Sequence, residues 1–102
     1  MRMIVQQEVG SSLSSREEGK RLRESILAVL HDHDFVELDF ESELVASVSF
    51  LDEALARLVE DLPTSDLKKR VRLLNFTEQD RQLLNMLTAA RLREKEPLQP
   101  GD

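Results

Sequence analysis

Acidic residues gather where the sequence predicts the end of a strand and the start of a helix. The five acids are Asp39, Glu41, Glu43, Asp52 and Glu53. Acids at the carboxyl end of a parallel strand can do acid–base work or bind Mg²⁺. They can equally be solvated acids of a loop and of a helix start, and Glu53 with Arg57 has the i, i+4 spacing of a helical ion pair. We expect the second arrangement.

The run His31-Asp32-His33-Asp34 contains two histidines at a spacing that could ligate a metal ion. It also falls at the expected end of a helix, where the helix dipole favours histidine without any ligand. No third ligand has a matching spacing, and no serine or cysteine nucleophile lies in a recognisable elbow. We therefore predict no catalytic residue, no metal site, no cofactor and no enzymatic activity.

Two serines, Ser47 and Ser49, precede a helical apolar pattern. Ser49 and Asp52 have the Ser-x-x-Asp spacing of a helix cap, so we expect Ser49 to accept a hydrogen bond from the amide of Leu51 or Asp52. Ser47 is the lesser candidate for this cap. The alternative role for either serine is that of a phosphate acceptor, since added charge at a helix start would change a binding face.

Charge and hydropathy exclude several classes of partner. The formal net charge of −6 opposes binding to nucleic acid, and no cysteine is present to form disulfides or thiolate metal sites. No apolar run approaches the roughly 18 residues of a membrane span, and the N-terminal residues are too polar for a signal peptide. We expect a cytoplasmic protein that contacts neither membrane nor nucleic acid. The basic cluster at residues 68–72 is expected to be a solvated turn, or a patch for an acidic partner.

Hydrophobic periodicity predicts three strands that alternate with three helices. Val36, Leu38 and Phe40 point to one face of a strand while Glu37 and Asp39 point to the other, which predicts a sheet with helices on one face only. Strands separated by helices pair in parallel. We expect a two-layer β-α-β-α-β-α domain over residues 1–93, with a small, mostly parallel sheet and a flexible tail at 94–102. The strands are predicted at 3–9, 35–40 and 71–75. The first helix is predicted from a cap at Ser14 or Ser15 to about Leu30, the second from near Ser49 to Pro63, and the third from a cap at Thr77. One further helical turn is predicted at Asp66–Arg70.

Four strings carry a family resemblance, and together they extend over most of the chain. They are SREEGKRLRE (15–24), VELDFES (36–42), SVSFLDEAL (47–55) and VRLLNFTEQDRQLL (71–84). In this order and spacing they resemble the STAS-like domain family of unknown function, which is related in fold to the anti-sigma-factor antagonist (STAS) domains. The resemblance implies an α/β domain without catalytic machinery of its own.

The resemblance also implies a role for the serines. In STAS relatives a partner kinase phosphorylates a serine at the start of the equivalent helix, and the modification switches partner binding. The relatives place an Asp-Ser-Ser-Gly-like turn there, and the corresponding residues of this chain are Ser47-Val48-Ser49-Phe50. The implied partner is a protein such as an ATPase or kinase-like regulator, and the partner-binding candidates are Ser49, Ser47, Phe50, Asp52 and Glu53.

Three functional hypotheses follow from these patterns. The leading one is a non-catalytic regulatory domain that binds a partner protein through the loop at 41–50 and the helix after it. The alternative is a homo-oligomer that pairs through an edge strand, at 3–9 or 71–75. The third is a small Mg²⁺-dependent or acid–base enzyme that uses the acids at 39–43 and 52–53.

Overall fold

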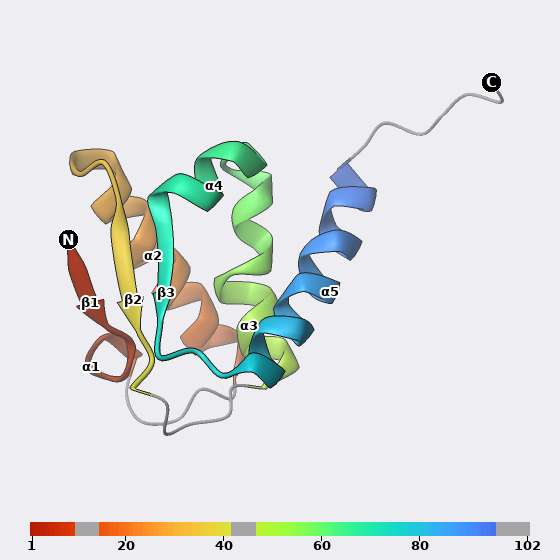
Figure 1. Cartoon of the computed structure of the whole chain (residues 1–102), viewed down its shortest axis with the longest axis horizontal. Coiled ribbons are helices and arrows are strands. Elements are labelled where there is room, and N and C mark those ends of the chain that lie inside the picture. Colours follow the sequence, from red (N-terminus) through yellow and green to blue (C-terminus); the bar gives the residue numbers. More distant parts are fainter. Residues whose placement is uncertain (10–14, 42–46, 96–102) are drawn as a thin grey trace, which may run out of the picture.

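The computed structural model describes residues 1–9, 15–41 and 47–95. Its centre is a parallel sheet of three strands in the order β1-β2-β3, shown in Figure 1. The strands are β1 (Arg2–Ile4), β2 (Val36–Asp39) and β3 (Val71–Leu74). The helices are α1 (Val5–Val9), α2 (Arg16–Asp32), α3 (Val48–Ala54), the 3₁₀ helix η1 (Ala56–Glu60), α4 (Thr64–Arg70) and α5 (Glu78–Lys95). The prediction of a small parallel α/β sheet is confirmed.

The order and extent of the elements differ from the prediction at four places. Residues 5–9, predicted as strand, form helix α1, in which Val5 is fully buried. A 3₁₀ helix follows α3, and the turn expected at 66–70 belongs to the longer helix α4. Helix α5 includes Glu94 and Lys95, which the sequence assigned to the tail. The rest of the predicted tail, residues 96–102, lies outside the described residues.

Two helices begin with the caps that the sequence indicates. Ser15 Oγ accepts from the amide of Glu18 at 3.1 Å, and Glu18 Oε1 accepts from the amide of Ser15 at 3.2 Å, which completes a capping box at the start of α2. Ser14, the other candidate for this cap, lies outside the described residues. Thr77 Oγ1 accepts from the amide of Asp80 at 3.1 Å and caps α5 as expected.

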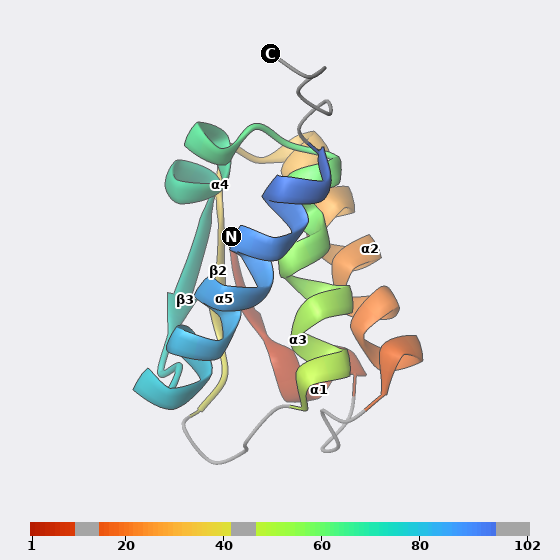
Figure 2. The ribbon, with the colours of Figure 1, turned by 90° about the vertical axis from the view of Figure 1, so that its right-hand side faces the viewer.

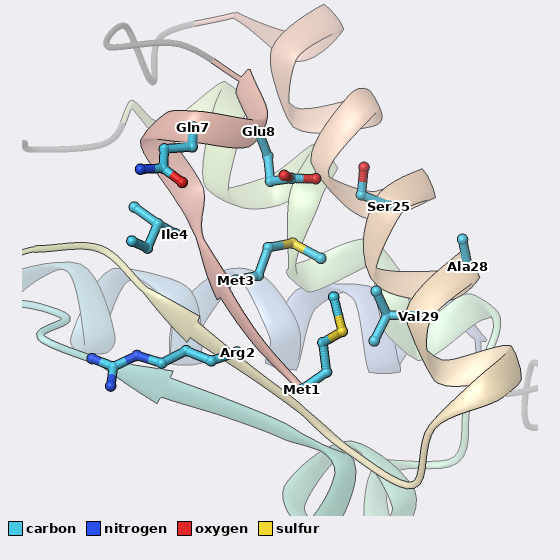
Figure 3. Close-up of a pocket in the computed structure, with 9 residues that line it drawn as sticks. All are labelled: Met1, Arg2, Met3, Ile4, Gln7, Glu8, Ser25, Ala28 and Val29. Atoms are coloured by element: carbon cyan, nitrogen blue, oxygen red, sulfur yellow. The ribbon is translucent and has the colours of Figure 1, made fainter.

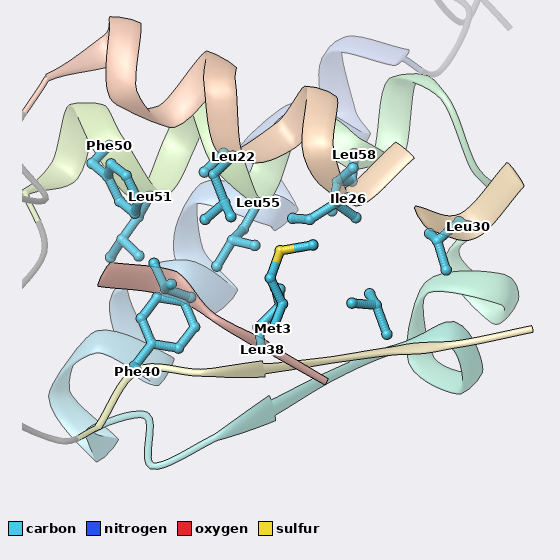
Figure 4. Packing of buried hydrophobic residues seen from close by; sticks show 13 residues of the cluster. Met3, Leu22, Ile26, Leu30, Leu38, Phe40, Phe50, Leu51, Leu55 and Leu58 are labelled. Atoms are coloured by element: carbon cyan, nitrogen blue, oxygen red, sulfur yellow. The ribbon is translucent and has the colours of Figure 1, made fainter. Parts of the chain in front are cut away.

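The core lies between the sheet and the helices α2, α3 and α5, which all lie on one side of the sheet (Figure 2). The register aligns Met3, Leu38 and Leu73 across the three strands on the helix side. Figure 4 shows how side chains from the strands and from α2 and α3 converge there. The fully buried members of this core include Val5, Leu22, Ile26, Val36, Leu38, Phe50, Leu51 and Ala54.

Helices α2 and α3 approach each other closely at Gly19. A Cβ atom built on Gly19 would lie 2.9 Å from the Cβ of Glu53 and 2.9 Å from the carbonyl oxygen of Phe50. Only a residue without a side chain fits this crossing, so Gly19 sets the distance between the two helices.

The opposite face of the sheet is polar and reaches solvent. The side chains of Arg2 and Arg72 on this face are 59% and 52% exposed. Asp39, predicted to lie on a solvated face, is only 6% exposed, because neighbouring polar groups surround its carboxylate. Within the described part of the chain, no helix is long and apolar enough to cross a membrane.

Candidate functional site

Asp39, at the carboxyl end of β2, forms hydrogen bonds that connect the three strands. Its Oδ1 accepts from Asn75 Nδ2 and from the amide of Glu41, both at 2.9 Å, and its Oδ2 accepts from Arg2 Nη2 at 2.7 Å. Hydrogen bonds from Asn75, Arg2 and Glu41, in that order of importance, lower the pKa of Asp39 to about 2. The carboxylate is therefore ionised at neutral pH, and its contacts join β1, β2 and the end of β3.

The backbone is left-handed just after β2 and just after β3. Glu41 has a φ of 59° and Asn75 a φ of 54°. Asparagine tolerates this region well, whereas for glutamate such a conformation costs on the order of 1 kcal/mol. Asp39 hydrogen-bonds both residues, so its carboxylate holds both turns in place.

The cap of α3 is Ser47, and the prediction of Ser49 as the cap was wrong. Ser47 Oγ accepts from the amide of Phe50 at 3.1 Å, and Ser47 has the extended backbone of an N-cap. Starting the helix two residues earlier buries Phe50 and Leu51 completely, and this burial outweighs the Ser-x-x-Asp signature at Ser49. Ser49 is half-buried in the first turn.

The first turn of α3 also carries an apolar side chain that faces solvent. Val48 is 51% exposed, one residue after the cap, whereas Phe50 in the same turn points into the core. Glu41, at the end of the preceding strand segment, is exposed as well. The intervening residues 42–46, which include the predicted Glu43, lie outside the described residues.

Asp52 is held between three helices by arginines. Arg91 of α5 makes a two-pronged contact, with Nε 3.0 Å from Oδ1 and Nη2 2.6 Å from Oδ2. Arg16 of α2 approaches Oδ2 at 3.1 Å. Arg91 is the main reason why the pKa of Asp52 lies below its ordinary value, and Arg16 adds to the effect against the opposing influence of burial.

Glu53 sits in a second arginine cluster next to Asp52. Burial alone would raise the pKa of Glu53, but Arg23, Arg57 and Arg16 together bring it below its ordinary value. Arg23 Nη1 and Arg57 Nη1 each lie 2.8 Å from Glu53 Oε2, and Arg16 Nη1 lies 3.2 Å from Glu53 Oε1. The ion pair of Glu53 with Arg57, indicated by the i, i+4 spacing, is confirmed.

These contacts separate the predicted site residues into two groups. Ser47 and Ser49 lie together in the first turn of α3, next to the exposed Val48. Asp52 and Glu53 are 8% and 7% exposed and lie against α2 and α5, with Phe50 in the core beneath them. No sequence pattern indicated Asn75 or Arg91 as partners of the acids, because both pairings join residues far apart in the chain.

His31 and Arg70, from the histidine run and the basic cluster, have structural partners. His31 Nδ1 lies 3.1 Å from Asp32 at the exposed end of α2. Within residues 1–9, 15–41 and 47–95, no group of three His, Cys, Asp or Glu side chains could hold a metal ion. Arg70 donates to the carbonyl oxygens of Leu30, His33 and Asp34, and thus caps the carboxyl end of α2.

The comparisons with known proteins point to one family. A family described as a STAS-like domain of unknown function matches residues 18–81, which is more than half of the chain. No curated protein and no solved structure matches the chain. The matched segment contains most of α2, the strands β2 and β3, the cap at Ser47 and the acids Asp39, Asp52 and Glu53. The chain therefore belongs to the family of STAS-like domains of unknown function.

Proposed function

We propose that this protein is a non-catalytic regulatory domain that binds a partner protein through the first turn of α3 and the adjoining carboxyl end of the sheet. The observation that carries the proposal is that the side chain of Val48 is 51% exposed in the first turn of α3. The acids that follow in the same helix, Asp52 and Glu53, already form ion pairs with arginines. An exposed aliphatic side chain at a loop-to-helix junction gives a partner an apolar contact.

The states of the acids favour binding over catalysis. Asp39, Asp52 and Glu53 are each hydrogen-bonded to one or more arginines, and each has a lowered pKa. A general acid or base that works near neutral pH needs a pKa close to 7, whereas the pKa values of these carboxylates are shifted further below 7. The enzyme hypothesis built on the acids at 39–43 and 52–53 is accordingly weaker than the hypothesis of a partner-binding domain.

Ser49 is the residue through which the proposed binding would be regulated. It lies two residues after the cap Ser47, beside Val48, in the first turn of the helix. A negative charge in that turn is compatible with the helix dipole, so a charged Ser49 would leave the fold intact while changing the face that a partner contacts. The partner would be a protein such as an ATPase or a kinase-like regulator.

The test compares partners captured from native lysate by the wild type, Ser49→Ala and Ser49→Asp, with mass spectrometry as the readout. Ser65→Asp is the matched control, because Ser65 holds the same second position in the exposed first turn of α4. We expect Ser49→Asp to lose a protein that the wild type, Ser49→Ala and Ser65→Asp all retain. If Ser49→Asp retains every captured protein, a charge in the first turn of α3 does not regulate partner binding.

A further inference from the structure

A small pocket of about 200 Å³ lies where α4, β3 and α5 meet (Figure 1). Its apolar lining consists of Leu55, Leu58, Leu67, Val71, Leu73 and Leu84. Leu55, which follows α3, and Leu58 of η1 are almost fully buried and form its base. The other four apolar side chains are only half-buried, although they pack against the core. The pocket therefore keeps apolar surface that a ligand can remove from water.

The polar part of the lining can donate hydrogen bonds and carries a positive charge. It is formed by Thr64 and Lys68 of α4 and by Asn85 and Thr88 of α5. The ammonium group, the two hydroxyls and the amide are all donors. None of the described residues that line the pocket is acidic, although the chain has 20 acidic and only 14 basic residues. This lining is complementary to an anionic group.

The charge of Lys68 is available to a ligand. Lys68 is exposed, and it forms no ion pair with any residue that the structure describes. Arg70 of the same helix, by contrast, donates to three carbonyl oxygens at the end of α2. A carboxylate at the pocket would thus meet a cation that no acid of the described fold neutralises.

The larger hollow beside β1, of about 490 Å³, has a different character (Figure 3). Figure 3 shows Glu8 on the same side of β1 as Met1 and Met3, whereas Arg2 points to the other side. Arg2 is also bound to Asp39 at 2.7 Å. An anion in that hollow would meet an acid and no free cation, so the smaller pocket is the better place for an anionic ligand.

We propose that the pocket between α4, β3 and α5 binds a small monocarboxylate, with its apolar body against the leucines and its carboxylate at Lys68. An apolar cavity of about 150 Å³ holds benzene, so this pocket suits a body of about six carbon atoms. Thr64, Asn85 and Thr88 supply further donors for the carboxylate oxygens. The pocket shares no residue with the first turn of α3, so ligand binding can be tested apart from partner binding.

The first test titrates the isotope-labelled protein with hexanoate and follows the amide signals by nuclear magnetic resonance. Hexanamide is the matched probe, because it has the same apolar body and no charge. We expect saturable shifts within residues 64–73 and 84–88, and a lower dissociation constant for hexanoate than for hexanamide. The absence of saturable shifts in these segments, or equal dissociation constants for the two probes, would overturn the proposal.

The second test removes the charge at the pocket. Lys69→Ala is the control for Lys68→Ala, since Lys69 is the next residue of α4, is also exposed and lies outside the pocket lining. We expect Lys68→Ala to raise the dissociation constant of hexanoate about threefold or more, as for other ion pairs near the surface. The affinity of Lys69→Ala should equal that of the wild type. Equal affinities for the two variants would contradict the role of Lys68.

The third test fills the pocket. Thr88→Phe puts a ring at a half-buried position of the lining, and Ala89→Phe adds the same ring at the next, exposed position of α5. We expect Thr88→Phe to lose the saturable shifts with hexanoate and Ala89→Phe to keep them. If the dispersed amide spectrum shows that both variants are folded and both bind hexanoate equally, the ligand does not occupy this pocket. The comparison of Lys68→Ala with Lys69→Ala decides the proposal if Thr88→Phe does not fold.

Discussion

Arg91 of α5 binds Asp52 of α3 through two nitrogens, at 2.6 and 3.0 Å, and so fastens the last helix to the centre of the fold. The planar guanidinium matches the carboxylate, which makes the contact directional as well as attractive. Arg16 approaches the same carboxylate from α2. One acid therefore fixes three helices relative to each other behind the turn that we assign to partner binding.

Replacement of Arg91 should loosen this arrangement. We expect Arg91→Ala to lower the free energy of unfolding by about 1–3 kcal/mol, because it leaves a mostly buried Asp52 with fewer donors. Arg93→Ala is the control, since Arg93 is exposed on the same helix. Urea denaturation measures the difference, and equal stability of the two variants would show that the Arg91 contact contributes nothing.

The two serines of α3 should differ in their effect on stability. Ser47 accepts the hydrogen bond of the Phe50 amide, so Ser47→Ala should cost about 1 kcal/mol in the free energy of unfolding. Ser49→Ala should cost little, since Ser49 already lies within the helix. Thermal unfolding of the two single variants checks this ranking, and a larger loss for Ser49→Ala would restore Ser49 as the cap.

Stability should fall in acid partly through Asp39. The pKa of Asp39 is about 2 in the folded protein and 3.8 as an ordinary value, so the unfolded chain binds the proton more readily. Asp39 therefore stabilises the fold above about pH 4, and this stabilisation is lost as the pH falls towards 2. Asp39→Asn should flatten the dependence of stability on pH in that window.

Urea denaturation at several pH values between 2 and 5 measures this dependence. Asp34→Asn, at an exposed position, controls for the loss of one negative charge. The lowered pKa values of Asp52 and Glu53 leave a residual dependence of the same sign in Asp39→Asn. If the free energy of unfolding of Asp39→Asn changes with pH as steeply as that of the wild type, the dependence cannot be assigned to Asp39.

Gly19→Ala should destabilise the protein although alanine favours helix by about 1 kcal/mol. The added methyl would meet the carbonyl oxygen of Phe50 and the Cβ of Glu53 at 2.9 Å, so α2 and α3 would have to separate. We expect a net loss of about 1–3 kcal/mol, as for other overpacked contacts. Lys20→Ala, at the next and exposed position, is the control, and a gain in stability for Gly19→Ala would mean that the crossing has room.

The sequence allowed prediction of the features that depend on local patterns. The alternation of Val36, Leu38 and Phe40 placed the central strand, and the hydroxyls of Ser15 and Thr77 marked two helix starts. The start of α3 could not be predicted in this way. Two serines offered competing caps there, and the burial of Phe50 against residues far away in the chain decided between them.

The hydrogen-bond partners of the acids could not be predicted from local sequence patterns either. The sequence placed Asp39 near the end of the central strand and Asp52 and Glu53 at the start of the next helix, and it indicated Arg57 as a partner of Glu53 at helical spacing. The structure does not join these acids in one cluster, because Asp39 contacts the strands while Asp52 and Glu53 contact α2 and α5. Asn75 and Arg91 reach the acids only after the chain folds, from 36 and 39 residues away. Solvated acids and acids bound to arginine therefore look the same in the sequence.

The most direct measurement of the central claim is the affinity of a captured partner for two matched variants. Val48→Glu and Met86→Glu each put a negative charge at an exposed apolar position, one in the first turn of α3 and the other on α5. We predict that Val48→Glu weakens binding at least tenfold, about 1.4 kcal/mol, while Met86→Glu binds like the wild type. Equal affinities for Val48→Glu and the wild type would place the binding face elsewhere on the molecule.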